Sequence, residues 1–318
     1  MQQDFKTIVL PTRSQPDTLV AIFILKQYGQ EKFPGIQDAK VEVWQAFPAG
    51  ENEESLLTKG ILLLDFGGGR FDHHGKTVQT TASNLISEYL GVQADPSLTK
   101  LLEYAKRDDF YGKGTISTDP IDRALGLSGL ITALNKSLPN NPEQVPDYII
   151  PLLWAHHAEE VRRTKELPDE FEAALREHKA EVFSVKQRDK NLRVVTIISN
   201  NASLAGYLRS QIGGRHDVVA QQISGGHMNI LTRPTKQVDL RSLAALIRAK
   251  ELGKDTSSMN LIEFSKTGTI SEVPNWYYDP ATNSILNGGL NPKEIQATKI
   301  PYRDFKKILE DGLSGKIK

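Results

Sequence analysis

Short apolar runs alternate with helical patterns through the first hundred residues, and this alternation restricts the chain to few folds. The runs at 7–10 and 60–66 are continuously apolar, and 40–47 alternates and is β-branched, so all three predict strands. Helical patterns cover 17–29 and 81–92, and each ends at a glycine. This order favours an α/β fold with a mostly parallel, doubly wound sheet, and ligands of such sheets bind beyond the carboxyl ends of the strands.

The rest of the chain predicts a smaller α+β C-terminal domain. A Pro/Asn-rich loop ends near residue 146, and the charged segment 147–187 predicts two helices with a break at Pro168. Later elements are expected as a strand at 192–198, two strands within 217–233, a helix at 239–253, a hairpin at 275–289 and a final helix at 301–313. We therefore expect one domain over 1–145, a helical linker over 146–190 and a second domain over 191–318.

Composition excludes several kinds of chemistry. The 318 residues include no cysteine, which removes disulfides, zinc–thiolate sites and cysteine nucleophiles. Basic and acidic residues number 39 each, so no global charge attracts nucleic acid or an anionic membrane. No apolar run reaches the ~18 residues that a membrane span needs, and the N-terminus lacks the apolar stretch of a signal peptide. We expect a soluble cytoplasmic protein without a membrane partner.

Four metal-binding residue types lie close together after the run at 60–66. Asp65 ends this predicted strand, where an unpaired carboxylate is costly to desolvate and a cation would neutralise it. Three glycines follow, and then Asp72, His73 and His74. Imidazole and carboxylate together suit manganese, iron or zinc. The alternative is a hydrogen-bonded loop in which Asp72 caps a turn and the histidines are solvated.

Three further aspartates lie where they could join this group. Asp17 follows the first strand and opens a helix, so it is either a metal ligand or a helix N-cap. Asp108 and Asp109 follow a predicted short helix and precede a glycine-flanked turn, so they are either ligands or a solvated acidic pair. His156 and His157 lie in a charged helical pattern and are expected on a solvated face.

These residues together resemble the DHH phosphoesterase superfamily, which includes exonucleases and nanoRNA phosphodiesterases and is named for the triplet that is Asp72-His73-His74 here. The resemblance covers about residues 5–125. It implies hydrolysis of a phosphodiester or phosphoanhydride assisted by Mn²⁺, or by Mg²⁺, Fe²⁺ or Zn²⁺. It also implies a role for each matching residue. Asp17, Asp65 and one of Asp108 and Asp109 would bind metal, His73 would be a terminal ligand, and His74 would face the phosphate.

Two positions depart from the pattern of that superfamily. Arg13 stands where its first motif has a histidine, and Leu19 stands where that motif has a second aspartate. Each of two metals would thereby lose a ligand, while Arg13 is a fixed cation that can bind a phosphate with two parallel hydrogen bonds. The hypothesis is one ion acting together with Arg13.

The C-terminal part carries a second, weaker resemblance. The segment with Gly225, Gly226 and His227 resembles the substrate loop of the DHHA1-type domain, which would offer amides and an imidazole to a phosphate, with Arg233 adding positive charge. The alternative is a plain hairpin turn. An aromatic cluster at 276–278 is interpreted as core rather than as a surface that stacks on bases.

The expected function is a hydrolase, a metal-dependent phosphoesterase or nuclease that acts on a nucleotide or short oligonucleotide, with a homodimer as one assembly that it could form. The first alternative is a catalytically inactive nucleotide or nucleic-acid binding protein of the same fold. The second is a structural subunit of a larger assembly. No P-loop and no Gly-x-Ser-x-Gly elbow is present to suggest other chemistry.

Overall fold

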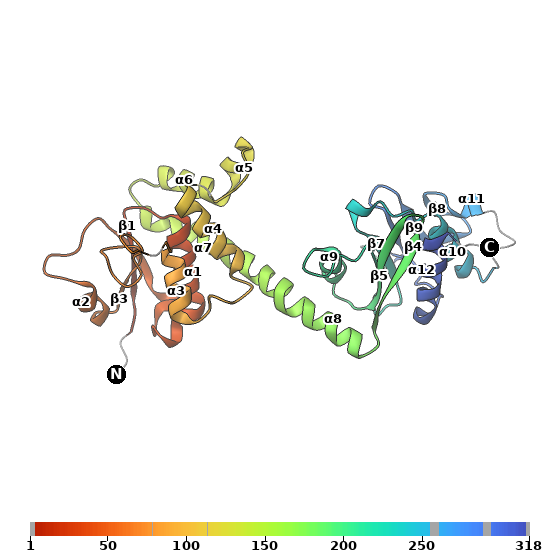
Figure 1. Cartoon of the computed structure of the whole chain (residues 1–318), viewed down its shortest axis with the longest axis horizontal. Coiled ribbons are helices and arrows are strands. Elements are labelled where there is room, and N and C mark those ends of the chain that lie inside the picture. The colour runs from red at the N-terminus through yellow and green to blue at the C-terminus, as the bar shows by residue number, and fades with distance from the viewer. Residues whose placement is uncertain (1–3, 78, 113, 255–260, 289–293, 316–318) are drawn as a thin grey trace. The chain divides into compact units, whose positions relative to one another are not determined.

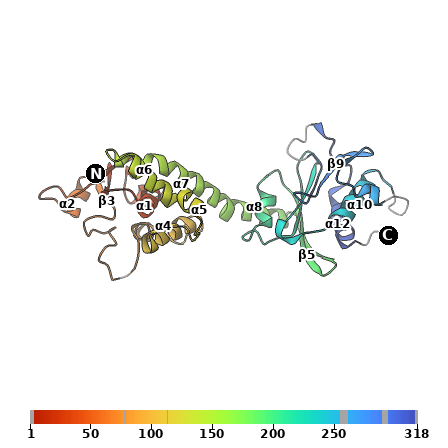
Figure 2. The same ribbon diagram turned by 90° about the horizontal axis from the view of Figure 1, so that it is seen from above.

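The structure is a computed structural model that describes residues 4–77, 79–112, 114–254, 261–288 and 294–315 (Figures 1 and 2). The chain divides into two compact units, Met1–Arg162 and Arg163–Lys318. Both units combine helices with a β-sheet, so the predicted α/β class is confirmed at this level. The first unit carries the sheet whose carboxyl edge was expected to bind a ligand.

The first unit contains a small parallel sheet with helices around it. Its strands are β1 (Thr7–Pro11), β2 (Lys40–Trp44) and β3 (Ile61–Leu63). Its helices are α1 (Pro16–Tyr28), α2 (Glu53–Thr58), α3 (Ala82–Leu90), α4 (Thr99–Tyr111), α5 (Pro120–Leu125), α6 (Leu127–Ser137) and α7 (Val145–Val161), with short 3₁₀ turns η1 (Gly29–Glu31), η2 (Ile36–Asp38) and η3 (Pro142–Gln144).

The three strands pair in the order β2-β1-β3, and both pairings are parallel. Ile8 and Leu62 face the main core, whereas Val9 and Leu63 face a small cluster around Leu56 of α2. Figure 1 shows α2 on the opposite side of the strands from α1 and α3, and Figure 2 shows the same for α1. Both faces of the sheet are therefore covered, and this explains why β1 and β3 read as continuous apolar runs.

Two strand predictions need correction. The run at 60–66, interpreted as a central strand, forms only the three-residue β3 and lies beside β1 at one end of the described sheet. The strand predicted over 40–47 ends at Trp44. In both cases the apolar pattern continues past the ladder because residues after the strand still pack, as Leu64 and Phe47 do.

Helix α1 lies at the centre of the first unit. All of its residues from Pro16 to Leu25 are buried, and it packs against α3, α4 and α7. Pro16 occupies the first turn, where a missing N–H costs nothing, and Gln15 exchanges capping hydrogen bonds with Thr18. Burial on all sides places the first-turn residue Asp17 inside the protein, 3% exposed.

The second unit is built on a larger sheet. Its strands are β4 (Ala180–Gln187), β5 (Lys190–Ile198), β6 (Val218–Gln222), β7 (Met228–Thr232), β8 (Gly268–Ile270), β9 (Val273–Asp279) and β10 (Ser284–Leu286). Its helices are α8 (Leu167–Arg176), α9 (Leu204–Arg209), α10 (Arg241–Glu251), α11 (Leu261–Phe264) and α12 (Phe305–Ser314), with 3₁₀ turns η5 (Pro234–Lys236) and η8 (Tyr302–Asp304).

The seven strands pair in the order β4-β5-β6-β7-β10-β9-β8. Only β5 and β6 run parallel; the other pairings are antiparallel. One apolar cluster joins the sheet to α10 and α12, and another joins it to α8 and α9. In Figure 1 α9 lies on one side of these strands, and α10 and α12 lie on the other. The predicted pairs within 217–233 and 275–289 are confirmed.

The helical linker predicted over 146–190 is not a separate element. Helix α7 belongs to the first unit, a π-helix, η4 (Arg162–Glu166), spans the boundary, and 180–187 is the strand β4. Pro168 lies at the start of α8, directly after the π-helix η4, and does not break a helix. The sequence of β4 misleads because charged residues face solvent on an outer strand, so no clear alternation appears. The C-terminal sheet is also larger than the sheet of the first unit.

Glu251 ends α10 and accepts hydrogen bonds from two other segments. One carboxylate oxygen accepts from Trp276 Nε1 at 3.0 Å and Thr298 Oγ1 at 2.6 Å, and the other accepts from the Lys299 amide at 3.0 Å. Burial alone raises the pKa of Glu251, but these donors outweigh burial, and the net pKa lies below its usual value of 4.5. The ionised carboxylate therefore stabilises the second unit.

We expect Glu251→Gln to lower the free energy of unfolding by about 2 kcal/mol at neutral pH, because a charge-assisted acceptor is lost. Since the folded-state pKa is depressed, the wild-type advantage is present above about pH 4.5 and disappears as pH falls through the folded-state pKa. Urea unfolding of both proteins at pH 7 and pH 3.5 measures this. Glu172→Gln, at an exposed position of α8, is the control, and an equal pH dependence in Glu251→Gln and wild type would contradict the assignment.

Candidate metal centre

Asp65 begins the loop between β3 and α3 in an uncommon backbone conformation. Its φ is 53°, a left-handed value that aspartate tolerates better than most residues. Leu64 N still donates to Val9 O at 2.9 Å, and Asp65 N donates to Phe71 O at 3.1 Å, so the chain reverses directly after the strand. Gly67 continues the turn at φ 74°, where a Cβ would lie 2.0 Å from the Phe47 ring. The reversal turns the Asp65 side chain inward, to 7% exposure.

Asp72 holds the loop in shape. Its carboxylate accepts hydrogen bonds from the Gly68 amide at 2.6 Å and the His74 amide at 2.9 Å, and it contacts His74 Nδ1 at 2.9 Å. Burial raises the pKa of Asp72, but the two amides and the His74 ring together hold it below its usual value. The hydrogen bond to Asp72 also raises the pKa of His74. Asp72 thus caps the turn, as the alternative of a hydrogen-bonded loop predicted, and it also fixes the ring of His74.

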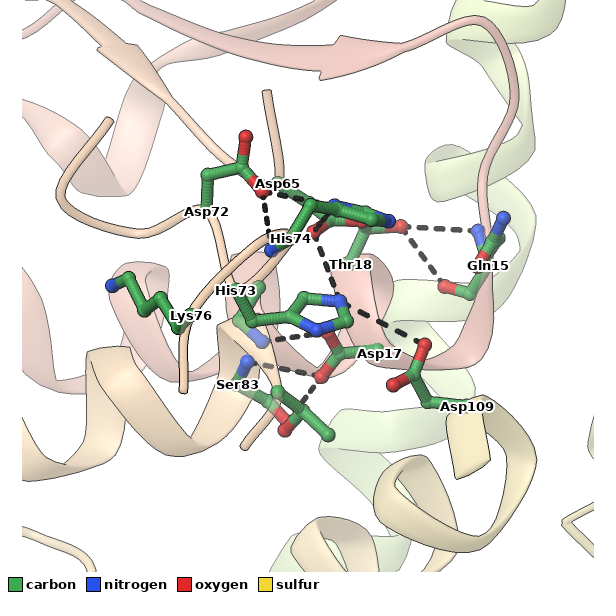
Figure 3. Close-up of polar contacts among 12 residues, drawn as sticks. Gln15, Asp17, Thr18, Asp65, Asp72, His73, His74, Lys76, Ser83 and Asp109 are labelled. Atoms are coloured by element: carbon green, nitrogen blue, oxygen red, sulfur yellow. Dashed lines mark hydrogen bonds and ion pairs between the residues drawn. The ribbon is translucent and has the colours of Figure 1, made fainter. Parts of the chain in front are cut away.

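Asp65, His73 and His74 bring their ligand atoms together (Figure 3). Asp65 Oδ1 lies 3.1 Å from His73 Nε2 and 3.2 Å from His74 Nδ1. Asp65 Oδ1 and His73 Nε2 are buried and have no hydrogen-bond partner among the described residues. Two ligands bonded at ~2.1 Å to one ion and at right angles lie about 3 Å apart. The donor set, its spacing and the unpaired atoms fit one divalent cation.

The electrostatics of Asp65 agree with this fit. Burial raises its pKa to about 6, and the nearby His73 and His74 only partly oppose the rise, while Asp17 and Asp72 add to it. Burial also raises the pKa of Asp109. A carboxylate that is costly to ionise in a buried position is stabilised in its charged form by a cation.

Helix α4 presents its two aspartates in different directions. Asp109 Oδ1 lies 3.7 Å from His73 Nε2. Asp108 instead accepts a short hydrogen bond from Ser128 of α6. Neighbouring residues of a helix project about 100° apart, so both could not face the same group. The geometry therefore brings Asp109, and not Asp108, to the site. Both aspartates lie within α4, which extends to Tyr111, and not after the helix as the sequence predicted.

Asp17 caps a helix, but not the helix that it opens. Its carboxylate accepts hydrogen bonds from the Ala82 amide at 2.7 Å, the Ser83 amide at 2.9 Å and Ser83 Oγ at 2.5 Å. These donors form the first turn of α3, so Asp17 caps a helix that lies 65 residues away rather than its own. Figure 3 shows Asp17 beside the His73 ring, close to the cluster but occupied by α3.

Arg13 and Leu19, the two positions that depart from the superfamily pattern, lie in different surroundings. Leu19 is fully buried in the core of the first unit and cannot act as a ligand. Arg13 is exposed and has no hydrogen-bond or ion-pair partner among the described residues. It lines a cavity of about 510 Å³ together with Lys136 and Asp108. Asp65 and the two histidines do not line this cavity, which lies on the Asp108 side of α4.

The C-terminal residues predicted to bind substrate are engaged within the second unit. His227 contacts Ile295 O through Nε2 at 2.8 Å, and Gly226 takes a φ of 81° and donates to Ile223 O. Arg233 forms an ion pair with the buried Asp217 at 2.6 Å. Gly225 is exposed in the same turn. These contacts describe a β-turn between β6 and β7, which was the alternative interpretation.

One tyrosine and one histidine show how burial departs from sequence expectation. Trp276 and Tyr278 are core residues as interpreted, whereas Tyr277 is 46% exposed. His157, expected on a solvated face, is 5% exposed and contacts Tyr28 Oη at 2.7 Å. The charged residues around His157 concealed its inward position. Residues that the sequence did not single out also shape the site region, namely Ser14, Ser83, Ser128, Asn135 and Lys136.

No protein-family model matches the chain, and no curated protein matches it. Among solved structures, the chain is similar to the crystal structure of an uncharacterized protein from Helicobacter pylori G27, at 13% identity and a TM-score of 0.26, with 98% of this chain and 99% of that chain covered. Among the helices that the structure describes, none combines the length and the apolar character that a membrane crossing requires.

We expect the protein to bind one equivalent of Mn²⁺, because one group of converging ligands is present among the described residues and Asp17 is occupied by α3. Asp65→Asn keeps the shape and the left-handed backbone but removes the charge, so it should abolish binding in isothermal titration calorimetry. His178→Asn, at an exposed site with φ 56° in the second unit, is the matched control. Two equivalents, or full binding by Asp65→Asn, would contradict the assignment.

Asp72→Ala should weaken Mn²⁺ binding by about 10–100-fold without removing a ligand, because residues that orient ligands have effects of this size. The loss follows from the freed His74 ring and the unpaired Gly68 amide. Asp72→Asn keeps one acceptor oxygen and should lie between Ala and wild type. Equal affinity of all three proteins in the same titration would show that Asp72 does not position the site.

Proposed function

We propose that this protein is a metal-dependent phosphohydrolase that cleaves a phosphodiester or phosphoanhydride of a nucleotide or short oligonucleotide. The observation that carries the proposal is the convergence of two buried atoms, Asp65 Oδ1 and His73 Nε2, which lie 3.1 Å apart without forming a hydrogen bond. Such a contact is costly to bury unless a third group binds both atoms. A divalent cation is the group that satisfies a carboxylate and an imidazole at once.

Different residues of the chain would have different roles at such a site. Asp65, His73 and His74 would hold the ion, and Asp109 lies within reach of it beside His73. Asp72 orients His74 through its ring and its backbone amide. A bound divalent ion supplies a Lewis acid that polarises a phosphoryl oxygen and lowers the pKa of a water molecule. The side chain of His74 is 68% exposed, so it can also meet a substrate from solvent.

Positive charge on the neighbouring surface supports an anionic substrate. Arg13 and Lys136 line the cavity next to α4, and neither is paired with a carboxylate among the described residues. The nucleotide character of the substrate rests on the resemblance of the triplet and Asp65 to phosphoesterases of nucleotides.

A second candidate function is a nucleotide-binding protein without catalysis. Asp17 caps α3 and Leu19 is buried, so the centre offers fewer ligands than a two-metal site needs. In that case an anion would bind at Arg13 and turnover would be absent.

The test is Mn²⁺-dependent hydrolysis of bis-p-nitrophenyl phosphate and of an end-labelled dinucleotide. We expect turnover by wild type and His178→Asn, and a loss of at least about 100-fold in Asp65→Asn and His73→Ala, because each removes a ligand. Circular dichroism of each variant establishes that the fold is retained. Equal turnover in all four proteins would place the chemistry elsewhere. Absence of turnover in wild type with retained nucleotide binding would select the second candidate.

A further inference from the structure

The cavity beside α4 is lined by several parts of the first unit. Its wall consists of the segment that leads from β1 into α1, the end of β2, Asp108 and Gly112 at the end of α4, and α6 with the segment that follows it. The volume, about 510 Å³, lies in the range of small-molecule sites. Polar side chains dominate the wall, and no aromatic ring belongs to it among the described residues.

Two cations line this cavity. Arg13 comes from the segment before α1, and Lys136 comes from the last turn of α6. Within the described chain neither forms an ion pair. The single carboxylate of the described lining is Asp108, and it already accepts a hydrogen bond from Ser128. The two free cations therefore match a ligand with two negative charges, which a phosphate monoester carries near neutral pH.

Buried polar atoms of the wall also lack partners. Ser14 is 1% exposed, and its Oγ has no hydrogen bond among the described residues. Asn135 donates through Nδ2 to Ser14 O at 2.8 Å, and its buried Oδ1 is left unpaired. Buried polar atoms are rarely left without a partner. Ser14 Oγ can donate to a phosphate oxygen, and Asn135 Oδ1 can accept only from a donor such as a hydroxyl group.

We propose that this cavity is a binding site for a sugar phosphate group, with Arg13, Lys136 and Ser14 on the phosphate and Asn135 on a sugar hydroxyl. Because no aromatic ring lines the cavity in the described chain, a base attached to the sugar is not recognised by stacking. The site therefore binds the phosphorylated sugar of a nucleotide irrespective of its base.

This inference rests on the proposed function in one respect, namely that one substrate would occupy both the cavity and the metal centre. Asp108 lines the cavity and the next residue, Asp109, faces His73, so the cavity adjoins the candidate metal centre across one residue of α4. A substrate with two phosphate groups would place one at each site. The cavity would thereby select the substrate, and the metal centre would act on it.

The binding experiment is calorimetry in EDTA, so that no divalent ion contributes. The probes are ribose 5-phosphate, AMP, CMP, inorganic phosphate and ribose. We expect ribose 5-phosphate, AMP and CMP to bind within about threefold of one another, inorganic phosphate to bind about tenfold more weakly, and ribose not to bind. Binding of AMP without binding of ribose 5-phosphate would overturn the proposal, because it would show recognition of the base.

Variants then locate the site. Arg13→Met and Lys136→Met should each weaken ribose 5-phosphate binding by about tenfold or more, since each removes a charged donor. Ser14→Ala should weaken it less, because one neutral donor is lost. Lys6→Met, at an exposed position of the same unit, is the matched control and should bind as wild type. Unchanged affinity in Arg13→Met and Lys136→Met would overturn the proposal.

Asp65→Asn separates this inference from the proposed function. It should bind ribose 5-phosphate in EDTA with wild-type affinity. If no hydrolysis is found in any protein but Arg13→Met still loses the ligand, the cavity stands and the phosphohydrolase proposal fails. If wild type hydrolyses the dinucleotide and Arg13→Met binds ribose 5-phosphate as wild type does, the metal centre stands and the cavity fails.

Discussion

The carboxylate of Asp17 joins the two helices on which the candidate site depends. It lies in the first turn of α1, the most buried helix of the first unit, and receives all its hydrogen bonds from the first turn of α3. The positive end of a helix favours such an anion. Helix α3 begins where the loop with Asp72, His73 and His74 ends. One end of this loop is thus fixed by Asp17, and the other is fixed by the pairing of Leu64 with β1.

Hydrogen-bond donors are distributed unequally among the carboxylates of this region. Asp17 has three donors from α3, and Asp72 has two amides and the His74 ring. Asp65 Oδ1 has none among the described residues. Burial raises the pKa of both carboxyl groups; at Asp72 the donors reverse this rise, whereas the pKa of Asp65 stays raised, at about 6. The fold therefore concentrates its unmet negative charge at one point, next to two imidazole rings.

Local patterns predicted much of the fold, and long-range contacts account for what they missed. The strand–helix order and the glycines at the ends of α1 and α3 are local features, and the sequence indicated them. The cluster of Asp65 with the two histidines was predictable for the same reason, since all lie within one loop. The capping of α3 by Asp17 was not, because its partners lie 65 residues away. The same holds for Asp108 and Asp109, which only the direction of α4 distinguishes.

The two departures in the first motif change the kind of cation that the site can use. Leu19 is in the core, so the position that would carry a second acid adds only apolar packing. Arg13 adds a guanidinium, which donates hydrogen bonds but cannot take the place of a metal ion in activating water. Under the proposed function, a metal ion at Asp65 would support hydrolysis, whereas Arg13 would bind and orient an anion, so the two cations are not interchangeable.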